Sequence, residues 1–242
     1  MCTMNKKQNI KALCIAAALL LSGFCAQAQD LEISAYFNGV LPTGQFNNKV
    51  TNLNPDPMNR DIFHPMNRDT IGMGAAAGIG FTLRAGLWFD MGFGELMPYV
   101  EGSFLWNSLR SDVRKAYDAA GAKYPSYYNI PLYLGFKYRY DINEIFRPFA
   151  EVGFGYDFFI ITKSAQQDDL WYRFKPTHAI GWQIGAGTYL GRNVSVGLYY
   201  LGLGSHKIAY AKKSRGRADD NTANITSPRS LGELAFRIGF HF

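Results

Sequence analysis

The sequence predicts an all-β fold: an eight-stranded antiparallel up-and-down transmembrane β-barrel. Three observations predict it. Apolar side chains recur at every second position in eight segments, and each segment reaches the ~9–11 residues that a membrane-spanning strand needs. The connections between the segments alternate between long and short, which is typical of barrels with an even number of strands. The chain also ends on an aromatic strand, "LGELAFRIGFHF".

Each strand is predicted from its own alternation. In 127–140 the even positions are apolar or aromatic from Tyr128 to Tyr140, whereas the odd positions include Lys137 and Arg139. The final segment places Leu, Phe, Ile, Phe and Phe at even positions, with Ala, Arg, Gly and His between them. In chain order, the predicted strands are 31–41, 75–90, 96–107, 127–140, 148–160, 179–190, 194–208 and 231–242.

The connections place the two rims of the barrel. Long stretches follow the first, third, fifth and seventh strands, and short turns such as "MGFGE" and "GRN" follow the second, fourth and sixth. All long loops therefore leave from one rim. The alternative is a soluble β-sandwich or lipocalin-like barrel, which would bury its bulky face. Here the regular face is the bulky aromatic one, and the other face carries glycines beside charges, which favours the membrane barrel. Aromatic rings near strand ends or on the outward face are expected to form girdles at the lipid headgroup level: Trp88, Tyr99, Trp106, Tyr127, Tyr128, Tyr140, Trp182 and Tyr200.

The N-terminus predicts export. Three lysines precede a short apolar run, and Ala26, Gln27 and Ala28 form an Ala-x-Ala cleavage site. The run is too short to span a bilayer as a helix. We expect residues 1–28 to be a cleaved signal peptide and residues 29–242 to be the barrel domain. The alternative is a lipoprotein signal at Cys25, which Phe24 disfavours because such signals place a small residue there.

Composition then excludes several function classes. All three cysteines lie in the signal, so the expected mature chain has no thiol chemistry. Cleavage removes three lysines and no acid, which lowers the formal net charge from +6 to +3. That small surplus and the export signal argue against nucleic acid as a partner. No pair of histidines has metal-ligand spacing, and we expect no cofactor.

The phase of each strand predicts which side chains enter the lumen. An eight-stranded barrel is just filled by its interior side chains. Near-balance of sign predicts a pairing network that plugs the lumen, because an unpaired buried charge would cost several kcal/mol. We expect Glu32 to approach Arg237 or His241 where the first strand closes on the last. The predicted structural network comprises Glu32, Arg84, Glu101, Lys137, Arg139, Glu151, Arg237 and His241, with Asp157 and Glu233 facing the same way.

One stretch resembles a known family. "YYNIPLYLGFKYRYDINEIFRPFAEVGFGYDF" is similar to bacterial outer-membrane β-barrels, in particular the small PorT-like and OmpA-like eight-stranded barrels of Bacteroidetes-type Gram-negative bacteria. The resemblance extends over residues 30–242. It implies a bacterial outer-membrane location, four long extracellular loops and short periplasmic turns. It also implies that Phe242 is the signal read by the barrel-assembly machinery. The matching residues are Ile130, Pro131, Leu132, Arg147, Pro148, Gly153 and Gly155.

Catalysis is not expected, although outer-membrane barrels include lipid A-modifying enzymes. Ser205 and His206 are the nearest approach to a nucleophile with its base, but neighbours on a strand point to opposite faces unless a bulge intervenes. The loops are better candidates for function. A candidate contact site for lipopolysaccharide phosphates, which bind guanidinium groups well, comprises Lys207, Lys212, Lys213, Arg215 and Arg217.

The sequence therefore favours a non-enzymatic membrane scaffold and surface-interaction protein with a plugged lumen. Its expected partners are outer-membrane lipid and lipopolysaccharide, the barrel-assembly machinery, and an unidentified extracellular or envelope partner. The first alternative is a narrow, porin-like channel for ions or very small solutes. A lipid A-modifying enzyme and a secretion-system accessory barrel remain as further alternatives.

Overall fold

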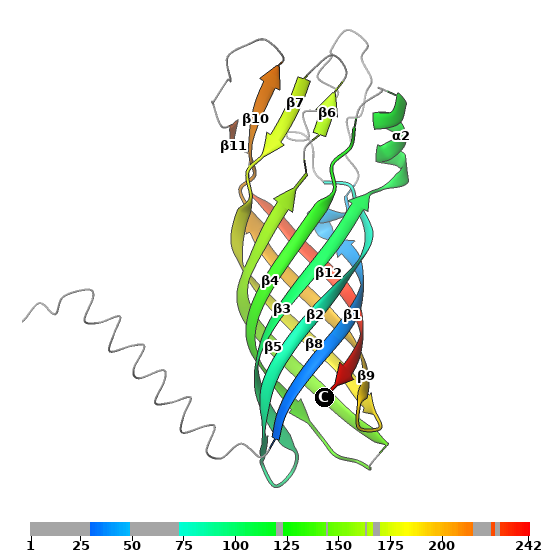
Figure 1. Cartoon of the computed structure of the whole chain (residues 1–242), viewed down its shortest axis with the longest axis vertical. Coiled ribbons are helices and arrows are strands. Elements are labelled where there is room, and N and C mark those ends of the chain that lie inside the picture. Colours follow the sequence, from blue (N-terminus) through cyan, green and yellow to red (C-terminus); the bar gives the residue numbers. More distant parts are fainter. Residues whose placement is uncertain are drawn as a thin grey trace, which may run out of the picture.

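The computed structural model describes residues 30–48, 73–119, 123–143, 145–162, 164–166, 170–214, 224–225 and 228–242. The predicted signal peptide lies outside these residues. Eight long strands close into an antiparallel barrel (Figure 1), with the order β1-β12-β9-β8-β5-β4-β3-β2. They are β1 (Asp30–Thr43), β2 (Ala75–Asp90), β3 (Glu95–Leu109), β4 (Tyr127–Arg139), β5 (Phe146–Ile161), β8 (Thr177–Leu190), β9 (Val194–His206) and β12 (Arg229–His241).

The predicted fold class is confirmed, and the first strand closes on the last. Strand β1 pairs antiparallel with β12 over ten positions, from Ser34 opposite His241 to Thr43 opposite Gly232. Beyond the last ladder position, the backbone N–H of Phe242 donates to the carbonyl of Ile33 at 2.9 Å. Closure leaves no unpaired edge in the wall, which is the condition for a sheet to sit in hydrocarbon.

The faces of the wall follow the alternation. Outward positions carry apolar side chains that are largely exposed, such as Leu134 at 66%, Phe154 at 63% and Ile180 at 71%. Inward positions of the same strands carry buried polar and charged side chains. A water-soluble protein would bury these apolar side chains, so their exposure indicates that the wall is surrounded by lipid hydrocarbon. Among the described residues, no helix has the length and apolar character to cross a bilayer.

A bulge interrupts the wall in β9. Leu231 of β12 pairs with Gly204, whereas the next residue, Gly232, pairs with Gly202, so Leu203 is extra. Gly204 has a φ of +92°, a conformation that side chains rarely tolerate. Because the extra residue reverses the alternation, Leu203 and His206 both lie buried inside.

The long connections carry structure that the sequence did not predict. They follow β1, β3, β5 and β9 and leave from one end, which we call the long-loop rim; the other end is the short-turn rim (Figure 1). Above the long-loop rim stands a second sheet in the order β11-β10-β7-β6. Its strands are β6 (Ser164–Gln166), β7 (Leu170–Phe174), β10 (Ala209–Ser214) and β11 (Asn224–Ile225).

An apolar cap closes the long-loop end of the lumen. The short 3-10 helix η1 (Gly44–Phe46) turns Phe46 inward, where it packs on Tyr127 and Phe159 with ring centroids 5.6 and 6.0 Å away. Helix α2 (Ser111–Ala119) adds buried Val113 to the same cluster. These side chains would shield the polar lumen below from water.

The predicted aromatic girdle is only partly present. Trp106, Trp182 and Tyr200 face outward, as expected for rings at the headgroup level. In contrast, Trp88 and Tyr99 lie at inward positions, and each is only 4% exposed. Tyr127 is likewise buried inside. The expectation was wrong for these three, because their strand phase places them in the lumen, where each hydroxyl or ring N–H hydrogen-bonds to the protein.

Candidate functional site

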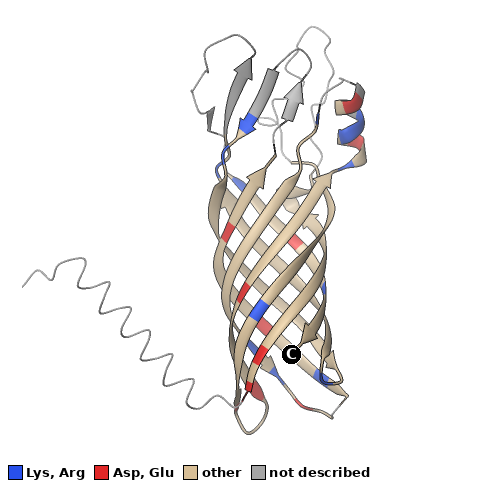
Figure 2. Ribbon diagram, in the orientation of Figure 1, with Lys and Arg blue, Asp and Glu red and all other residues tan. Residues whose placement is uncertain are grey.

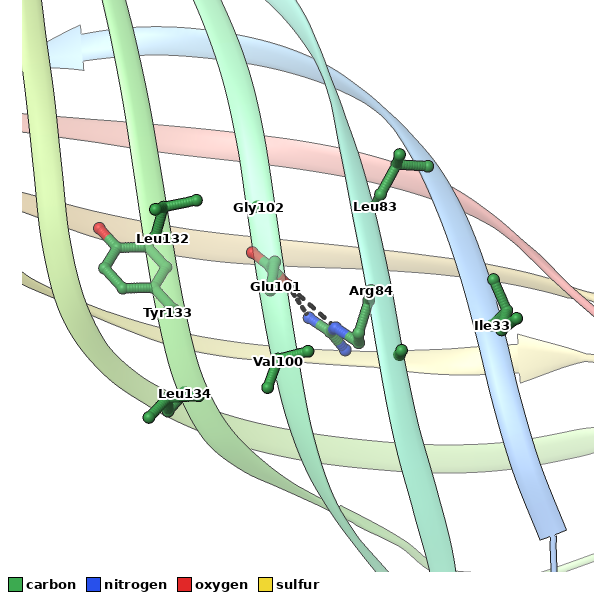
Figure 3. A pocket seen from close by; sticks show the side chains of 10 residues that line it. Ile33, Leu83, Arg84, Val100, Glu101, Gly102, Leu132, Tyr133 and Leu134 are labelled. Carbon is green, nitrogen blue, oxygen red and sulfur yellow. Dashed lines mark hydrogen bonds and ion pairs between the residues drawn. The ribbon is translucent and has the colours of Figure 1, made fainter. Parts of the chain in front are cut away.

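The lumen near the short-turn rim contains a closed network of ion pairs. Arg84 on β2 lies directly opposite Glu101 on β3, and Lys137 on β4 lies directly opposite Glu151 on β5. The guanidinium of Arg84 spans the space between them: Nε donates to Glu101 at 2.9 Å, and Nη1 donates to Glu151 at 2.8 Å. Figure 3 shows the Arg84–Glu101 contact, and the four side chains are buried.

Arg237 extends this network across the lumen from β12. Its Nη1 donates to Glu101 Oε1 at 3.0 Å, and its Nη2 donates to Gln183 Oε1 at 3.2 Å. Gln183 in turn donates to the hydroxyl of Tyr99 at 2.9 Å. We call Arg84, Glu101, Lys137, Glu151 and Arg237 the lower ion network. Its charges span five strands, so it ties opposite sides of the barrel together.

Tyrosine rings support the cations of the lower ion network. The guanidinium carbon of Arg84 lies 4.0 Å from the ring centroid of Tyr99, and that of Arg237 lies 4.2 Å from Tyr199. Such cation–π contacts are worth ~2 kcal/mol when desolvated. A glycine lies across the sheet from each ring and leaves the space that the ring fills: Gly135 faces Tyr99, and Gly185 faces Tyr199.

Arg139 lies closer to the short-turn rim and forms a separate pair. Its guanidinium donates to Glu95, the residue directly across on β3, and its Nε lies 3.7 Å from Asp141. It also stacks over the ring of Trp88, with 4.1 Å from the guanidinium carbon to the centroid. Glu95 was outside the strand predicted from sequence, which began one residue later. The alternation alone could have included it.

Glu32 meets His241, one of its two expected partners, at 2.9 Å between Oε1 and Nδ1. The other ring nitrogen of His241 lies 2.7 Å from the hydroxyl of Ser195 on β9. Trp88 and Tyr189 donate to the carboxylate of Glu32 at 2.9 and 3.2 Å. Serine, histidine and carboxylate are thus connected in the order of a hydrolase relay, although Ser195 is only 1% exposed.

Sequence reasoning missed Ser195, because strand phase does not identify partners across strands. The pair that it considered points apart: Ser205 is exposed and His206 is buried. His206 Nε2 lies 2.9 Å from the carbonyl of Leu203 and 3.2 Å from the carboxylate of Asp157, so a buried acid and not the neighbouring serine lies beside it. Among the residues that the structure covers, no three His, Cys, Asp or Glu side chains form a metal-binding group.

The remaining sequence candidates lie at the two ends. Lys207 is exposed just beyond β9, and Lys212 and Lys213 lie on β10 of the upper sheet. Arg215 and Arg217 lie outside the described residues. The ring of Phe242 is 80% exposed at the seam between β1 and β12.

The outer wall carries shallow apolar depressions. One lies beside the lower ion network at Gly102, which leaves a gap between neighbouring outward side chains (Figure 3). Its rim is formed by Ile33, Leu83, Val100, Leu132 and Leu134. Charged residues are sparse along the ribbon of the wall in Figure 2, and the side chains of those at inward positions are buried. The depression therefore offers hydrocarbon contacts and is compatible with a lipid chain.

Comparisons with known proteins agree with this geometry. A model of the outer membrane protein beta-barrel domain matches residues 16–226. A major outer membrane protein from Thermus thermophilus is 12% identical, with a TM-score of 0.52, and the match covers 88% of this chain and 100% of that one. A comparison with curated proteins found no match.

Two further solved structures are similar at lower TM-scores. The outer membrane enzyme PagL is 13% identical with a TM-score of 0.39, covering 86% of this chain and 97% of its own. Ail, the attachment invasion locus protein of Yersinia pestis, is 13% identical with a TM-score of 0.41, covering 88% and 97%. The family match, which covers most of the sequence, and the closed eight-stranded wall together lead to one conclusion. The chain belongs to the outer membrane protein beta-barrel domain family and is a transmembrane barrel of the bacterial outer membrane.

Proposed function

We propose that this chain is a non-enzymatic outer-membrane barrel with a plugged lumen, which acts as a scaffold and presents its long-loop end to partners outside the cell. One observation carries the proposal: the lower ion network crosses the lumen with its side chains buried. An ion passing through would have to break charge-assisted hydrogen bonds between desolvated groups, each worth ~1.5–3 kcal/mol.

The apolar cap supports the same proposal. Phe46, Tyr127 and Phe159 pack against each other at the long-loop end, with exposures of 0%, 5% and 1%. Water and small ions would therefore meet an apolar barrier before they reach the charged layer. Two barriers of different chemistry, one at each half of the lumen, favour a closed barrel over a narrow channel.

Planar-bilayer recording tests the closed lumen. The refolded chain, with its fold checked by heat-modifiable migration on gels, is expected to give no steady single-channel steps. Steps in the wild type that disappear in Arg84→Met or Lys137→Met would establish the channel alternative. Arg192→Met, at an exposed position in the turn between β8 and β9, is the matched control and should behave like the wild type.

The relay formed by Ser195, His241 and Glu32 makes the absence of catalysis testable. Because the hydroxyl of Ser195 is buried against His241, we expect no reaction with a serine-directed fluorophosphonate probe. We also expect no change in acyl mass when lipid A is incubated with the refolded barrel. Labelling that is lost in Ser195→Ala, or a loss of acyl mass, would replace the scaffold proposal with that of a hydrolase.

The basic residues at the long-loop end support lipopolysaccharide as a surface partner. Lys207 is exposed, and Lys175 lies nearby because its backbone N–H donates to the carbonyl of Ala209 at 2.8 Å. Arg173 is also exposed, so three bases gather at the base of the upper sheet. Their replacement by alanine is expected to weaken binding of purified lipopolysaccharide, whereas Arg192→Ala at the opposite rim should not. Equal loss in both variants would contradict the assignment.

Two finer assignments complete the proposal. The "IPL" and "RPF" positions support placement among PorT-like barrels, and a secretion-accessory role would follow only if deletion of the chain impaired protein export. The exposed ring of Phe242 at the seam supports recognition by the barrel-assembly machinery. That contact could form before closure, because the ring points away from the lumen.

A further inference from the structure

The upper half of the lumen holds two buried carboxylates that have no lysine or arginine partner among the described residues. Asp157 on β5 and Glu233 on β12 are both fully buried. The residues across the sheet from them on either side are all apolar: Pro131 and Ala179 beside Asp157, and Leu201 and Pro42 beside Glu233. In the lower ion network, by contrast, Glu101 and Glu151 each face a base directly across the sheet. The two halves therefore differ in their charge balance.

His206 does not resolve this imbalance. Its Nε2 lies 3.2 Å from Asp157, but the same nitrogen lies 2.9 Å from the carbonyl of Leu203, to which it must donate. Its Nδ1 lies 2.9 Å from the hydroxyl of Thr177, which can donate to it. A neutral imidazole thus satisfies both ring nitrogens. The backbone N–H of Ile130 lies near Asp157, and the Asn107 amide lies near Glu233, but no carboxylate oxygen of either acid makes a hydrogen bond of full geometry.

Buried amides near the two acids also have atoms without a hydrogen-bond partner. Asn129 is 0% exposed, and neither its amide oxygen nor its amide nitrogen has a hydrogen-bond partner. It lies on the same face of the wall as Asp157, one diagonal step away on the adjacent strand. The amide oxygen of Asn107 is likewise buried and unpartnered, and the Asn107 side chain lies within reach of Glu233.

These groups face the same upper part of the lumen, which we call the chamber. Glu233 and Asp157 interact electrostatically, and the hydroxyl of Tyr133, which is also unpartnered, interacts with both acids. The lower ion network lies below them and the apolar cap lies above. Unpartnered buried polar groups are rare in folded proteins, because each costs ~1–3 kcal/mol, and more when it is charged. Five of them in one enclosed space point to a ligand that supplies their missing contacts.

We propose that this chamber binds one divalent, oxygen-preferring cation, with Ca²⁺ as the best fit, between Asp157 and Glu233 and the amide oxygens of Asn107 and Asn129. One divalent ion balances two carboxylates. Carboxylate and amide oxygens are the ligands that Ca²⁺ takes, often with waters that complete its shell. Two of the four protein ligands are amides, so the site differs from a cluster made of acids, histidines or cysteines alone. It is independent of what the upper sheet binds.

Calcium-dependent stability of the full chain tests the proposal. The protein is refolded in detergent with either CaCl₂ or EGTA, so that the ion can enter before the lumen closes. At a Ca²⁺ concentration of roughly 100 times Kd we expect Tm to rise by about 5–10 °C. Native mass spectrometry should show one retained calcium per chain. An unchanged Tm together with no retained metal would overturn the proposal and leave protonated carboxyl groups as the explanation.

Variants locate the site. Asp157→Asn with Glu233→Gln should abolish the calcium shift while raising Tm in EGTA, because the uncompensated charges are gone. Asn129→Ala, which keeps both acids, should weaken calcium binding without abolishing folding, and it serves if the double variant does not assemble. Asp118→Asn on the exposed face of α2 is the control and should keep the full shift. A shift retained in the double variant, or an equal shift with NaCl alone, would refute the divalent site.

Discussion

Replacement of Arg84 by methionine tests whether the lower ion network holds the barrel together. Methionine keeps much of the length of the side chain but removes the charge and every donor. Arg84 donates hydrogen bonds to both Glu101 and Glu151, and the side chains of all three residues have no solvent exposure. The variant therefore leaves two buried carboxylates with fewer partners.

The expected loss can be worked from the remaining contacts. Charge-assisted hydrogen bonds contribute ~1.5–3 kcal/mol each, so a simple sum over the bonds of Arg84 would overstate the effect. Glu101 keeps Arg237 at 3.0 Å, and Glu151 keeps Lys137 at 3.5 Å. Removing one partner of a buried ion pair typically costs ~3–5 kcal/mol, and we expect the free energy of unfolding of the variant to fall by that amount.

Urea unfolding of the refolded barrel in detergent, followed by tryptophan fluorescence and by heat-modifiable migration, measures this loss. Arg192→Met in the exposed β8–β9 turn is the control and should change stability by less than ~0.5 kcal/mol. A cycle with Glu151→Gln should give a coupling energy of ~0.5–3 kcal/mol. A loss below ~1 kcal/mol in Arg84→Met would refute the view that this network stabilises the wall.

Three further predictions concern packing, capping and assembly. Gly185→Ala would place a Cβ 2.2 Å from the ring of Tyr199, so it should destabilise the barrel by ~1–3 kcal/mol in the same urea assay. Gly39→Ala is the control and should be neutral, because a Cβ there would have nothing within 4 Å. Equal effects of the two substitutions would contradict the packing argument. Phe46→Ala should speed amide hydrogen exchange in residues 44–48 without lowering the stability of the wall, and unchanged exchange would argue against the cap. Phe242→Ala should reduce the yield of folded barrel in membranes while leaving refolding in detergent intact, because its backbone bond to β1 remains; loss in both settings would indicate a structural role instead.

The strands were predictable because lipid and lumen impose opposite chemistry on alternate residues. Each of the eight predicted segments corresponds to one strand of the wall, with ends that differ by a few residues. The approach of Glu32 to His241 followed from closure of the first strand on the last. Such contacts depend only on strand order and phase, which the alternation carries.

Other contacts depend on register or on loops and were not predictable. Ser195 of β9 pairs with Gly239 of β12, and its hydroxyl contacts the ring of His241, two residues further along β12, at 2.7 Å. Alternation does not determine which residues align across two strands, so this contact could not be predicted. The bulge at Gly204 reverses the phase of β9 and turns His206 inward. The upper sheet and α2 belong to connections without a period-two pattern long enough to detect.

The division of the barrel into a cross-braced half and a capped half bears on how such a chain can change over evolutionary time. The residues of the lower ion network lie far from the long connections. An insertion in one of these connections therefore adds mainly the entropic cost of loop closure, ~0.6 kcal/mol for each doubling of loop length. The long connections can therefore change in length at low cost, whereas the lower ion network and its tyrosine–glycine pairs tolerate little change.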